Sequence, residues 1–313
     1  MLMTNRSGRL LTGILLCLLL AFPLAVLAEG LKLLVVLSDA TAPYLSFEST
    51  LKKTLPSSAH VSVLEHPELL SPDMTQTDLI VAVGMKATEM AVTNTRIPVL
   101  AVMIPRAGYE NLLAETSGKH LAHPTSAIYL DQPWRRRIDF WRAALPGRKR
   151  IGLLHSPDKH FDVSRLRQDV ARRGGSLVAQ PVLSADELFA GLEKVLASSD
   201  VLLAIPDSLI YTSNNIRSIM LSSYRHGVPL IGLSQAYVNA GALCAIFSTP
   251  EQLAVQASAA VMEFSQAGKL PQPQYPATFT TAVNQQVARS LGIDMPSEEV
   301  IRSRMDKAPE EGQ

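Results

Sequence analysis

Short apolar runs of strand length recur along the chain, and stretches with helical spacing separate them. In the first half these runs cover residues 31–37, 61–64, 79–83 and 99–104, and helices are expected over residues 45–55 and 85–92. The runs are continuously apolar rather than alternating, which is typical of strands buried on both faces of a parallel sheet. The first half therefore predicts a doubly wound α/β lobe.

A second series of the same kind follows a run at residues 125–130. Strands are expected over residues 150–155, 177–183, 201–205, 228–233 and 243–247, and helices over 133–144, 163–173, 185–197 and 215–226. Pro133 at a helix start and Gly174 after a helix end are common boundary residues. The second half therefore predicts another doubly wound lobe.

The end of the chain adds a helix over residues 251–266, a Pro-rich connector over 271–276, a strand over 278–282 and a helix over 285–291. Extra elements of this kind are natural where a chain crosses between two lobes several times, and several crossings make a hinge. We expect lobe 1 at residues 29–131 plus 248–270 and lobe 2 at residues 132–247 plus 276–300. Residues 301–313 are expected to be a disordered tail. The predicted fold is two doubly wound parallel-sheet lobes joined by a multi-strand hinge.

The first 28 residues have the pattern of a cleavable signal peptide. Arg6 and Arg9 precede an apolar run over residues 10–27, and the small residues Val26 and Ala28 mark a cleavage site. A membrane anchor is the alternative reading because the run approaches the length that a bilayer requires. Cys17 lies inside the run and not at the cleavage point, so a lipoprotein is not expected. The pattern predicts a soluble periplasmic protein.

Charge and cysteine content narrow the function further. Cleavage would remove two of the 29 basic residues and leave 27 against 28 acidic ones, so we expect no bulk attraction for nucleic acid. Cys244 would be the only cysteine left, which rules out an internal disulfide in the mature chain. Its apolar neighbours predict a buried structural thiol.

Five segments in order across residues 125–296 resemble a known family: TSAIYLDQPWRRRIDFWRAALPGRKRIGLL, DVLLAIPDSLIY, HGVPLIG, NAGALCAIFS and TTAVNQQVARSLGIDMP. They resemble the ABC-transporter substrate-binding proteins of the type I periplasmic-binding fold, in the uncharacterised transport-component branch related to tryptophan-binding lipoproteins. The resemblance implies a monomer with a small-molecule ligand and an ABC permease or other inner-membrane partner. VVLSDAT and VAVGMKAT agree in outline. The chain departs from the family at residues 101–109, where relatives have an Asp-Pro loop, and in lacking a lipobox.

Ligands of open α/β sheets meet the loops at the carboxyl ends of the strands. Hydroxyls and helix N-termini there can donate to a ligand carboxylate, Asp39 or Asp207 can meet an amine, and tyrosines can cover an apolar body. We expect an amino-acid-like or small polar or aromatic ligand, and expect Asp207→Ala to weaken binding at least about tenfold without appreciable loss of fold. The candidate ligand-binding residues are Ser38, Asp39, Tyr44, Gly84, Met85, Arg106, His155, Ser156, Asp207, Ser208, Tyr211, Ser234 and Gln235.

Other chemistries find less support. The run around Ser234 approximates a nucleophile elbow, but residue 236 is alanine and residues 237–241 do not read as a helix start. The pairs His120/His123 and His155/His160 lack the spacing of a metal site, and no nucleotide-binding fingerprint occurs. We therefore expect no enzyme, no metal and no cofactor, and the arginines of residues 134–142 are expected in water. A ligand sensor that reports to a membrane receptor is the alternative function, and a periplasmic hydrolase is less favoured.

Overall fold

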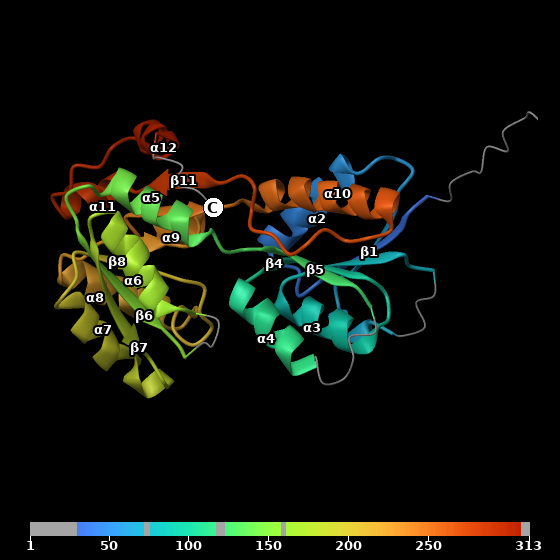
Figure 1. Ribbon diagram of the computed structural model, residues 1–313, viewed down its shortest axis with the longest axis horizontal. Coiled ribbons are helices and arrows are strands. Elements are labelled where there is room, and N and C mark those ends of the chain that lie inside the picture. Colours follow the sequence, from blue (N-terminus) through green and yellow to red (C-terminus); the bar gives the residue numbers. More distant parts are fainter. Residues whose placement is uncertain (1–29, 72–75, 117–122, 158–160, 308–313) are drawn as a thin grey trace, which may run out of the picture.

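The computed structural model describes residues 30–71, 76–116, 123–157 and 161–307. The predicted signal peptide, His120 and His160 lie outside the described residues. Two α/β lobes lie side by side along the long axis of the molecule (Figure 1), each built on its own sheet. The predicted fold class is confirmed. No helix in the described ranges is long and apolar enough to cross a membrane.

Lobe 1 contains a five-stranded parallel sheet in the order β2-β1-β3-β4-β5. Helices α2 and α10 cover one face of this sheet, and helices α3 and α4 cover the other (Figure 1). The continuous apolar runs account for this arrangement, because all five residues of β3 are buried between the two helical layers. The elements are β1 (Lys32–Leu37), α2 (Ala42–Thr54), β2 (His60–Leu64), β3 (Leu79–Val83), α3 (Met85–Asn94), β4 (Val99–Ile104), α4 (Arg106–Thr116), β5 (Thr125–Tyr129) and α10 (Pro250–Ala267).

Lobe 2 contains a six-stranded sheet in the order β11-β10-β9-β8-β6-β7, in which β11 alone runs antiparallel. Its core is built around Trp141 and Phe140 of helix α5, both fully buried. The elements are α5 (Trp134–Ala144), β6 (Arg150–His155), α6 (Val163–Arg172), β7 (Ser176–Pro181), α7 (Leu188–Leu196), β8 (Val201–Leu203), α8 (Ile216–Arg225), β9 (Leu230–Gly232), α9 (Gln235–Ala240), β10 (Cys244–Phe247), β11 (Thr280–Val283), α11 (Gln285–Ser290) and α12 (Glu298–Asp306).

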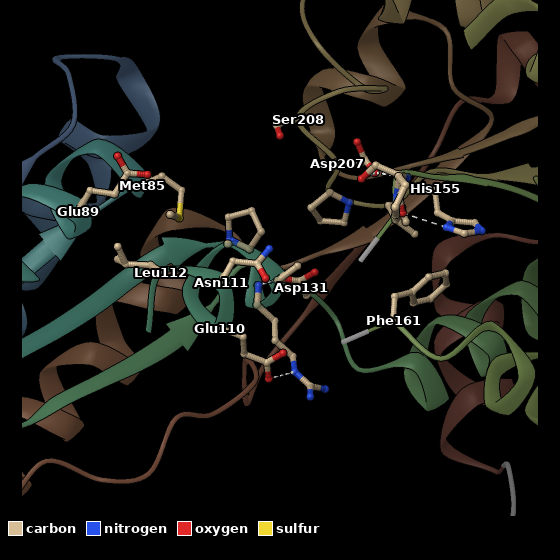
Figure 2. Close-up of a pocket in the computed structure, with 18 of the residues that line it drawn as sticks. Met85, Glu89, Glu110, Asn111, Leu112, Asp131, His155, Phe161, Asp207 and Ser208 are labelled. Atoms are coloured by element: carbon tan, nitrogen blue, oxygen red, sulfur yellow. Dashed lines mark hydrogen bonds and ion pairs between the residues drawn. The ribbon is translucent and has the colours of Figure 1, made fainter. Parts of the chain in front are cut away.

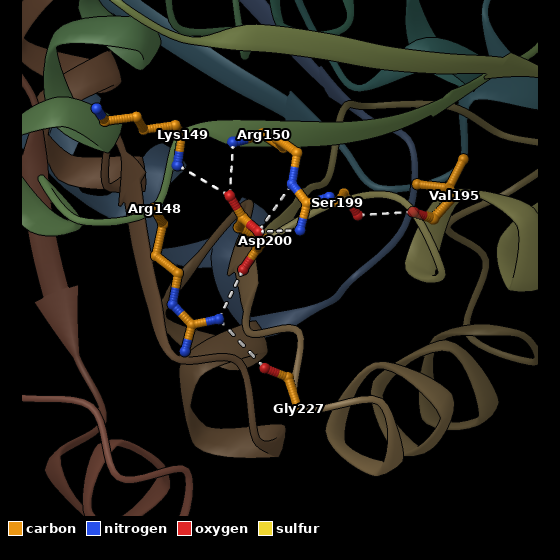
Figure 3. Close-up of polar contacts among 7 residues, drawn as sticks. All are labelled: Arg148, Lys149, Arg150, Val195, Ser199, Asp200 and Gly227. Carbon is orange, nitrogen blue, oxygen red and sulfur yellow. Dashed lines mark hydrogen bonds and ion pairs between the residues drawn. The ribbon is translucent and has the colours of Figure 1, made fainter.

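A carboxylate fixes the amino ends of two neighbouring strands in lobe 2 (Figure 3). Asp200, just before β8, accepts hydrogen bonds from the backbone N–H groups of Lys149 and Arg150, at 3.1 and 2.9 Å, and from the Arg150 guanidinium at 2.7 Å. These bonds lower the pKa of the Asp200 carboxyl, with the Arg150 side chain as the main cause. The cluster therefore fixes the register of β6 against β8 at the amino ends of these strands. The loop that follows His155 lies at the opposite end of the sheet.

Three helices differ from the sequence-based expectation. Helix α4 occupies residues 106–116, where no helix was expected, and its first turn overlaps residues 101–109, where the chain departs from the family that it resembles. Helix α9 starts at Gln235, so the expectation that no helix follows Ser234 was wrong. Helix α12 extends into the expected tail, because Ser297 caps its N-terminus and the side chain of Ile301 is fully buried. The end of the chain after residue 307 lies outside the described residues.

Three crossings connect the lobes: residues 130–133 between β5 and α5, residues 248–249 between β10 and α10, and residues 268–279 between α10 and β11. The third crossing also touches the edge of the first sheet. The backbone of Gln274 donates to the carbonyl oxygen of Ala127 at 2.9 Å and accepts from the N–H of Tyr129 at 3.0 Å. The last crossing is therefore attached to both sheets.

The burial of Cys244 is confirmed. Its side chain has no solvent exposure in β10, between β9 and β11, and burial raises the pKa of the thiol. A thiol held neutral in this way is a poor nucleophile.

Candidate functional site

A cavity of about 820 Å³ lies between the two lobes. Figure 2 shows Met85, Asn111 and Leu112 of lobe 1 on one side of this space and His155, Phe161 and Asp207 of lobe 2 on the other. The crossings contribute Asp131, Gln132 and Tyr275 to its wall. The cavity therefore lies at the carboxyl ends of the strands of both lobes, where open α/β sheets bind ligands.

The structure brings six of the thirteen candidate residues into the cavity wall: Met85, Arg106, His155, Ser156, Asp207 and Ser208. The other seven lie outside this wall. In lobe 1, Ser38 accepts a hydrogen bond from the N–H of Ala87 at 3.0 Å, and Asp39 accepts one from the N–H of Thr41 at 2.8 Å. Both side chains thus shape the local backbone at the ends of β1 and β3.

Gly84 and Tyr44 belong to the same packed corner of lobe 1. Gly84 has a φ of +87°, and a Cβ atom at this position would lie 2.5 Å from the Tyr44 hydroxyl and 2.6 Å from Ser38 Oγ. Burial raises the pKa of Tyr44. The positive φ and the close approach of the Tyr44 and Ser38 side chains both favour glycine here, and the tyrosine fills this corner rather than the cavity wall.

Three further candidates lie outside the cavity in lobe 2. Tyr211 is buried, and within the described residues its hydroxyl has no hydrogen-bond partner. The Gln235 side chain donates to Asn239 at 2.9 Å along α9. Ser234 is the N-cap of α9 with φ −163° and ψ 172°, which is ordinary extended backbone. A nucleophile elbow needs a strained turn at its serine, so the geometry at Ser234 does not match one.

Asp207 lines the cavity with its carboxylate already engaged. Oδ2 accepts hydrogen bonds from the N–H and hydroxyl of Ser156, and Oδ1 accepts from the N–H groups of Leu209 and Ile210 at 2.9 and 3.1 Å. A carboxylate has about four acceptor positions. Asp207 therefore uses its acceptor capacity to order the loops after β6 and β8.

Arg137 is a cavity residue that the sequence analysis placed wrongly in water. It lies one turn after Trp134 and one turn before Trp141, on the buried face of α5. Its guanidinium donates to the carbonyl oxygen of Ala204 and lies 4.6 Å from the centroid of the Trp134 ring. Burial lowers the pKa of Arg137 to about 10, and the charge of Asp131 opposes this shift. The side chain is therefore a buried cation at neutral pH.

Asp131 supplies the opposite charge from the first crossing. Its Oδ2 accepts a hydrogen bond from the backbone N–H of Arg106 at 2.6 Å. Burial raises the pKa of the Asp131 carboxyl, although the Arg106 N–H and the charge of Arg137 both favour the ionised form. No sequence signal singled out Asp131, because it follows β5 in a segment that the analysis treated only as a connection.

Aromatic rings flank the two charges. In lobe 2 the ring of Phe161 lies 5.6 Å from Trp134 and 5.1 Å from His155, centroid to centroid. On the other side Tyr275 lies 5.4 Å from Tyr129. The cavity can therefore hold an apolar or aromatic body next to a charged group.

The side chain of the predicted ligand residue Arg106 has one partner in lobe 1 and one in the third crossing. Its Nε is 2.6 Å from Glu110 Oε1, and its Nη1 donates to the Tyr275 hydroxyl at 2.8 Å. These hydrogen bonds raise the pKa of Arg106 even though its partial burial acts in the opposite direction. Among the described residues no group of three or more His, Cys, Asp and Glu side chains could hold a metal ion.

Comparisons with known proteins agree with this geometry. The family described as ABC transporter substrate binding protein matches residues 73–306 of the chain. A comparison with curated proteins gives no match.

Several solved structures have the same fold. A Streptococcus pneumoniae ABC domain in complex with L-Trp has a TM-score of 0.63 at 17% identity. The match covers 87% of this chain and 98% of the Streptococcus chain. A ligand-free, open substrate-binding protein with adhesive properties from Clostridium difficile has a TM-score of 0.62 at 15% identity, covering 86% and 97%. A conserved domain protein from Vibrio cholerae has a TM-score of 0.59 at 18% identity, covering 88% and 98%.

Proposed function

This chain belongs to the ABC transporter substrate-binding protein family, and on that premise we propose that it is an exported solute-binding protein that delivers a small amino-acid-like ligand to an ABC permease. The observation that supports the ligand class best is the presence of two opposite charges, the buried Arg137 and the partly buried Asp131, in the wall of the interlobe cavity. Two such charges match the carboxylate and the ammonium of a zwitterion.

The anionic end of the ligand would bind Arg137. A guanidinium has five N–H donors, and within the described part of the chain one hydrogen bond from Arg137 is seen, to the carbonyl oxygen of Ala204. Donors therefore remain for a carboxylate, which guanidinium groups bind in a two-pronged geometry. Because the cation is already desolvated, its interaction with a ligand anion is screened little by water.

The cationic end would bind Asp131, and the ligand body would lie against Trp134 and Phe161. Burial of the Asp131 carboxylate without a ligand is costly, as the raised pKa of this group indicates, and an ammonium at this position would offset that cost. One structural relative is a complex with L-Trp, which makes aromatic amino acids the first compounds to try.

Binding would favour closure of the two lobes. Asp131 is held by the backbone of Arg106 in lobe 1, whereas Arg137 and Phe161 belong to lobe 2. A ligand that contacts both sides completes its contacts only when the cavity shuts, so it binds the closed state more tightly and shifts the population toward it.

A thermal-shift screen of the purified protein tests the ligand class, because ligands of the native state raise its apparent stability. We expect stabilisation by one or more L-amino acids, and weaker or no stabilisation by the same compounds with an acetylated amine or an amidated carboxylate. Arg137→Met should lose binding, and Lys149→Met, in the distant Asp200 cluster, is the matched control. Full binding by Arg137→Met, or a response to blocked and free compounds alike, contradicts the assignment.

Export and partner form the second part of the proposal. The pattern of residues 1–28 supports cleavage after Ala28 without lipidation, so intact-mass measurement of the periplasmic protein should give a chain starting at Glu29. A membrane-bound species that retains residues 1–28 contradicts this. Deletion of the gene should abolish uptake of the identified ligand, whereas unchanged uptake with a changed signalling output would favour the sensor function.

A further inference from the structure

The three crossings between the lobes meet in one chain of hydrogen bonds. Arg136 Nη1 donates to Gln132 Oε1 at 2.6 Å, and Gln132 Nε2 donates to Ser248 Oγ at 2.8 Å. The Ser248 hydroxyl in turn donates to the carbonyl oxygen of Thr278 at 2.5 Å. Gln132, Ser248 and Thr278 each belong to a different crossing, so this donor chain links all three.

The direction of this donor chain is fixed by the chemistry of its members. Ser248 has one proton and uses it on Thr278, so its oxygen can only accept from the first crossing. An amide at position 132 satisfies this requirement, because its NH₂ faces Ser248 while its oxygen accepts from Arg136. Gln132 and Ser248 are both about 6% exposed, so water cannot easily replace a missing bond.

The third crossing is held on both sides of this point. On the lobe 2 side, Arg136 donates to the carbonyl oxygen of Pro276 at 2.9 Å, and its guanidinium lies 4.8 Å from the centroid of the Phe279 ring. On the lobe 1 side, Gln256 of α10 donates to the carbonyl oxygen of Tyr275 at 3.1 Å and accepts from the N–H of Ala277 at 2.8 Å. Residues 275–277 of the third crossing are therefore held by hydrogen bonds from both lobes.

The donor chain also borders the ligand cavity. Gln132 is part of the cavity wall and follows Asp131 directly, and Arg136 precedes Arg137 on α5. Successive residues of a helix point in different directions, so Arg137 faces the cavity and Arg136 faces the crossings. The two charges proposed to bind the ligand are therefore each one residue away from a member of the donor chain.

We propose that Gln132 is a positioning residue that locks the three crossings into a single pivot and sets the angle between the lobes. The pivot is a property of the unliganded protein. Its influence on affinity, through the placement of Asp131 and Arg137, rests on the proposed function.

Gln132→Glu tests the direction of the donor chain. A carboxylate keeps its contact with Arg136 and adds charge to it, but presents a second acceptor to Ser248, whose proton is committed to Thr278. Ser248→Ala removes the same link from the other side, and Ser248→Thr retains the hydroxyl. Gln168→Glu, on the exposed face of α6, is the matched control for the change of charge.

The measurement is the distance distribution between spin labels on the two lobes, attached at the exposed positions Lys53 and Lys194 and recorded without ligand. We expect Gln132→Glu and Ser248→Ala to broaden or shift the distribution, while Ser248→Thr and Gln168→Glu keep that of the parent. Distributions that coincide for all variants would overturn the proposal. The result does not depend on any ligand, so failure of the amino-acid screen would leave it unaffected.

A merely structural role for Gln132 would appear as a general loss of stability. Thermal unfolding of the same variants separates the two cases. We expect Gln132→Glu and Ser248→Ala to change the distance distribution at temperatures well below their unfolding midpoints, where both lobes retain the circular dichroism of the parent. A changed distribution that always accompanies loss of helical signal would count against a pivot.

Discussion

Ser156 donates two hydrogen bonds to a single carboxylate oxygen of Asp207, one from its backbone N–H at 2.8 Å and one from its hydroxyl at 2.7 Å. The two residues belong to loops that follow different strands, β6 and β8, and both line the cavity. The pair therefore holds one part of the lobe 2 wall in shape, and it changes what a substitution of Asp207 should do.

We expect Asp207→Ala to lower the free energy of unfolding by about 1–3 kcal/mol, because it leaves partly buried donors of both loops without an acceptor. Ligand affinity should fall at least about tenfold as the wall loses its shape. The original expectation of a variant with unaffected fold is thus revised. Urea unfolding measures the change, with Ser156→Ala, which removes one hydrogen bond, as the milder comparison. Parent-like stability of Asp207→Ala would contradict the role of this carboxylate.

Ligand affinity should fall as the pH is lowered toward the raised pKa of Asp131. An ammonium group binds the ionised carboxylate, and burial raises the pKa of Asp131 above the usual value of about 3.9 for an aspartate. Arg137 stays charged over this interval, so it does not contribute to the change. Calorimetric titration from neutral to mildly acidic pH measures this. Asp131→Asn should bind weakly with little pH dependence, and an equal pH dependence in this variant would exclude Asp131 as the cause.

The same group has the opposite effect on stability. A carboxyl whose pKa is higher in the folded state binds protons more tightly there, so its contribution to the free energy of unfolding decreases as the pH rises through that raised value. Comparison of the parent with Asp131→Asn in denaturant at several pH values should show this contribution in the parent alone.

Gly175→Ala should destabilise lobe 2. A Cβ atom at this position would lie 2.3 Å from the Trp141 ring and 2.8 Å from the carbonyl oxygen of Lys149, and Trp141 is fully buried in the core. Displacement of such a ring costs about 1–3 kcal/mol. Gly147→Ala is the control, because nothing lies within 4 Å of its Cβ position. Equal thermal midpoints for the two variants would show that the core accommodates the added methyl group.

Cys244 should react slowly with a thiol reagent in the native protein and rapidly once the protein is unfolded. The thiol is fully buried in β10, and burial raises its pKa, so the reactive thiolate is scarce. The time course of reaction with and without denaturant measures this directly. A rapid native reaction, or a disulfide-linked dimer under oxidising conditions, would contradict the burial.

The sequence was informative where local composition determines structure. The apolar runs predicted the strands. The rule that ligands bind at the carboxyl ends of parallel strands selected His155 and Asp207, and both lie in the cavity wall. Arg137 could have been found as well, since it is three residues after Trp134 and four before Trp141, on the face that the helical period predicts to be buried. Three consecutive arginines are more typical of a solvated helix face, which is why the charge pattern predicted the wrong environment for Arg137.

The remaining residues of the site depend on tertiary geometry. Asp131, Gln132 and Tyr275 come from segments that read as connections, and only the meeting of the three crossings brings them to the cavity. Conversely, Ser38 and Tyr44 follow a strand as the rule requires, yet their side chains pack beside Gly84 in a corner of lobe 1, outside the cavity wall. Helix α12 was missed because its only fully buried side chain is Ile301, which gives little apolar periodicity.

The return of α10 to lobe 1 has a consequence for the order in which the molecule can fold. Leu253, Ala257 and Val261 of this helix are fully buried in the same core as Phe47 and Leu51 of α2. The chain that forms lobe 2 lies between these two halves of one core. During synthesis from the N-terminus, most of lobe 2 is therefore made before α10 can complete the core of lobe 1. This order differs from that of proteins whose domains fold one after another along the chain. Lobe 1 begins first but needs α10, so until about 260 residues have been made only α2 can cover that face of its first sheet.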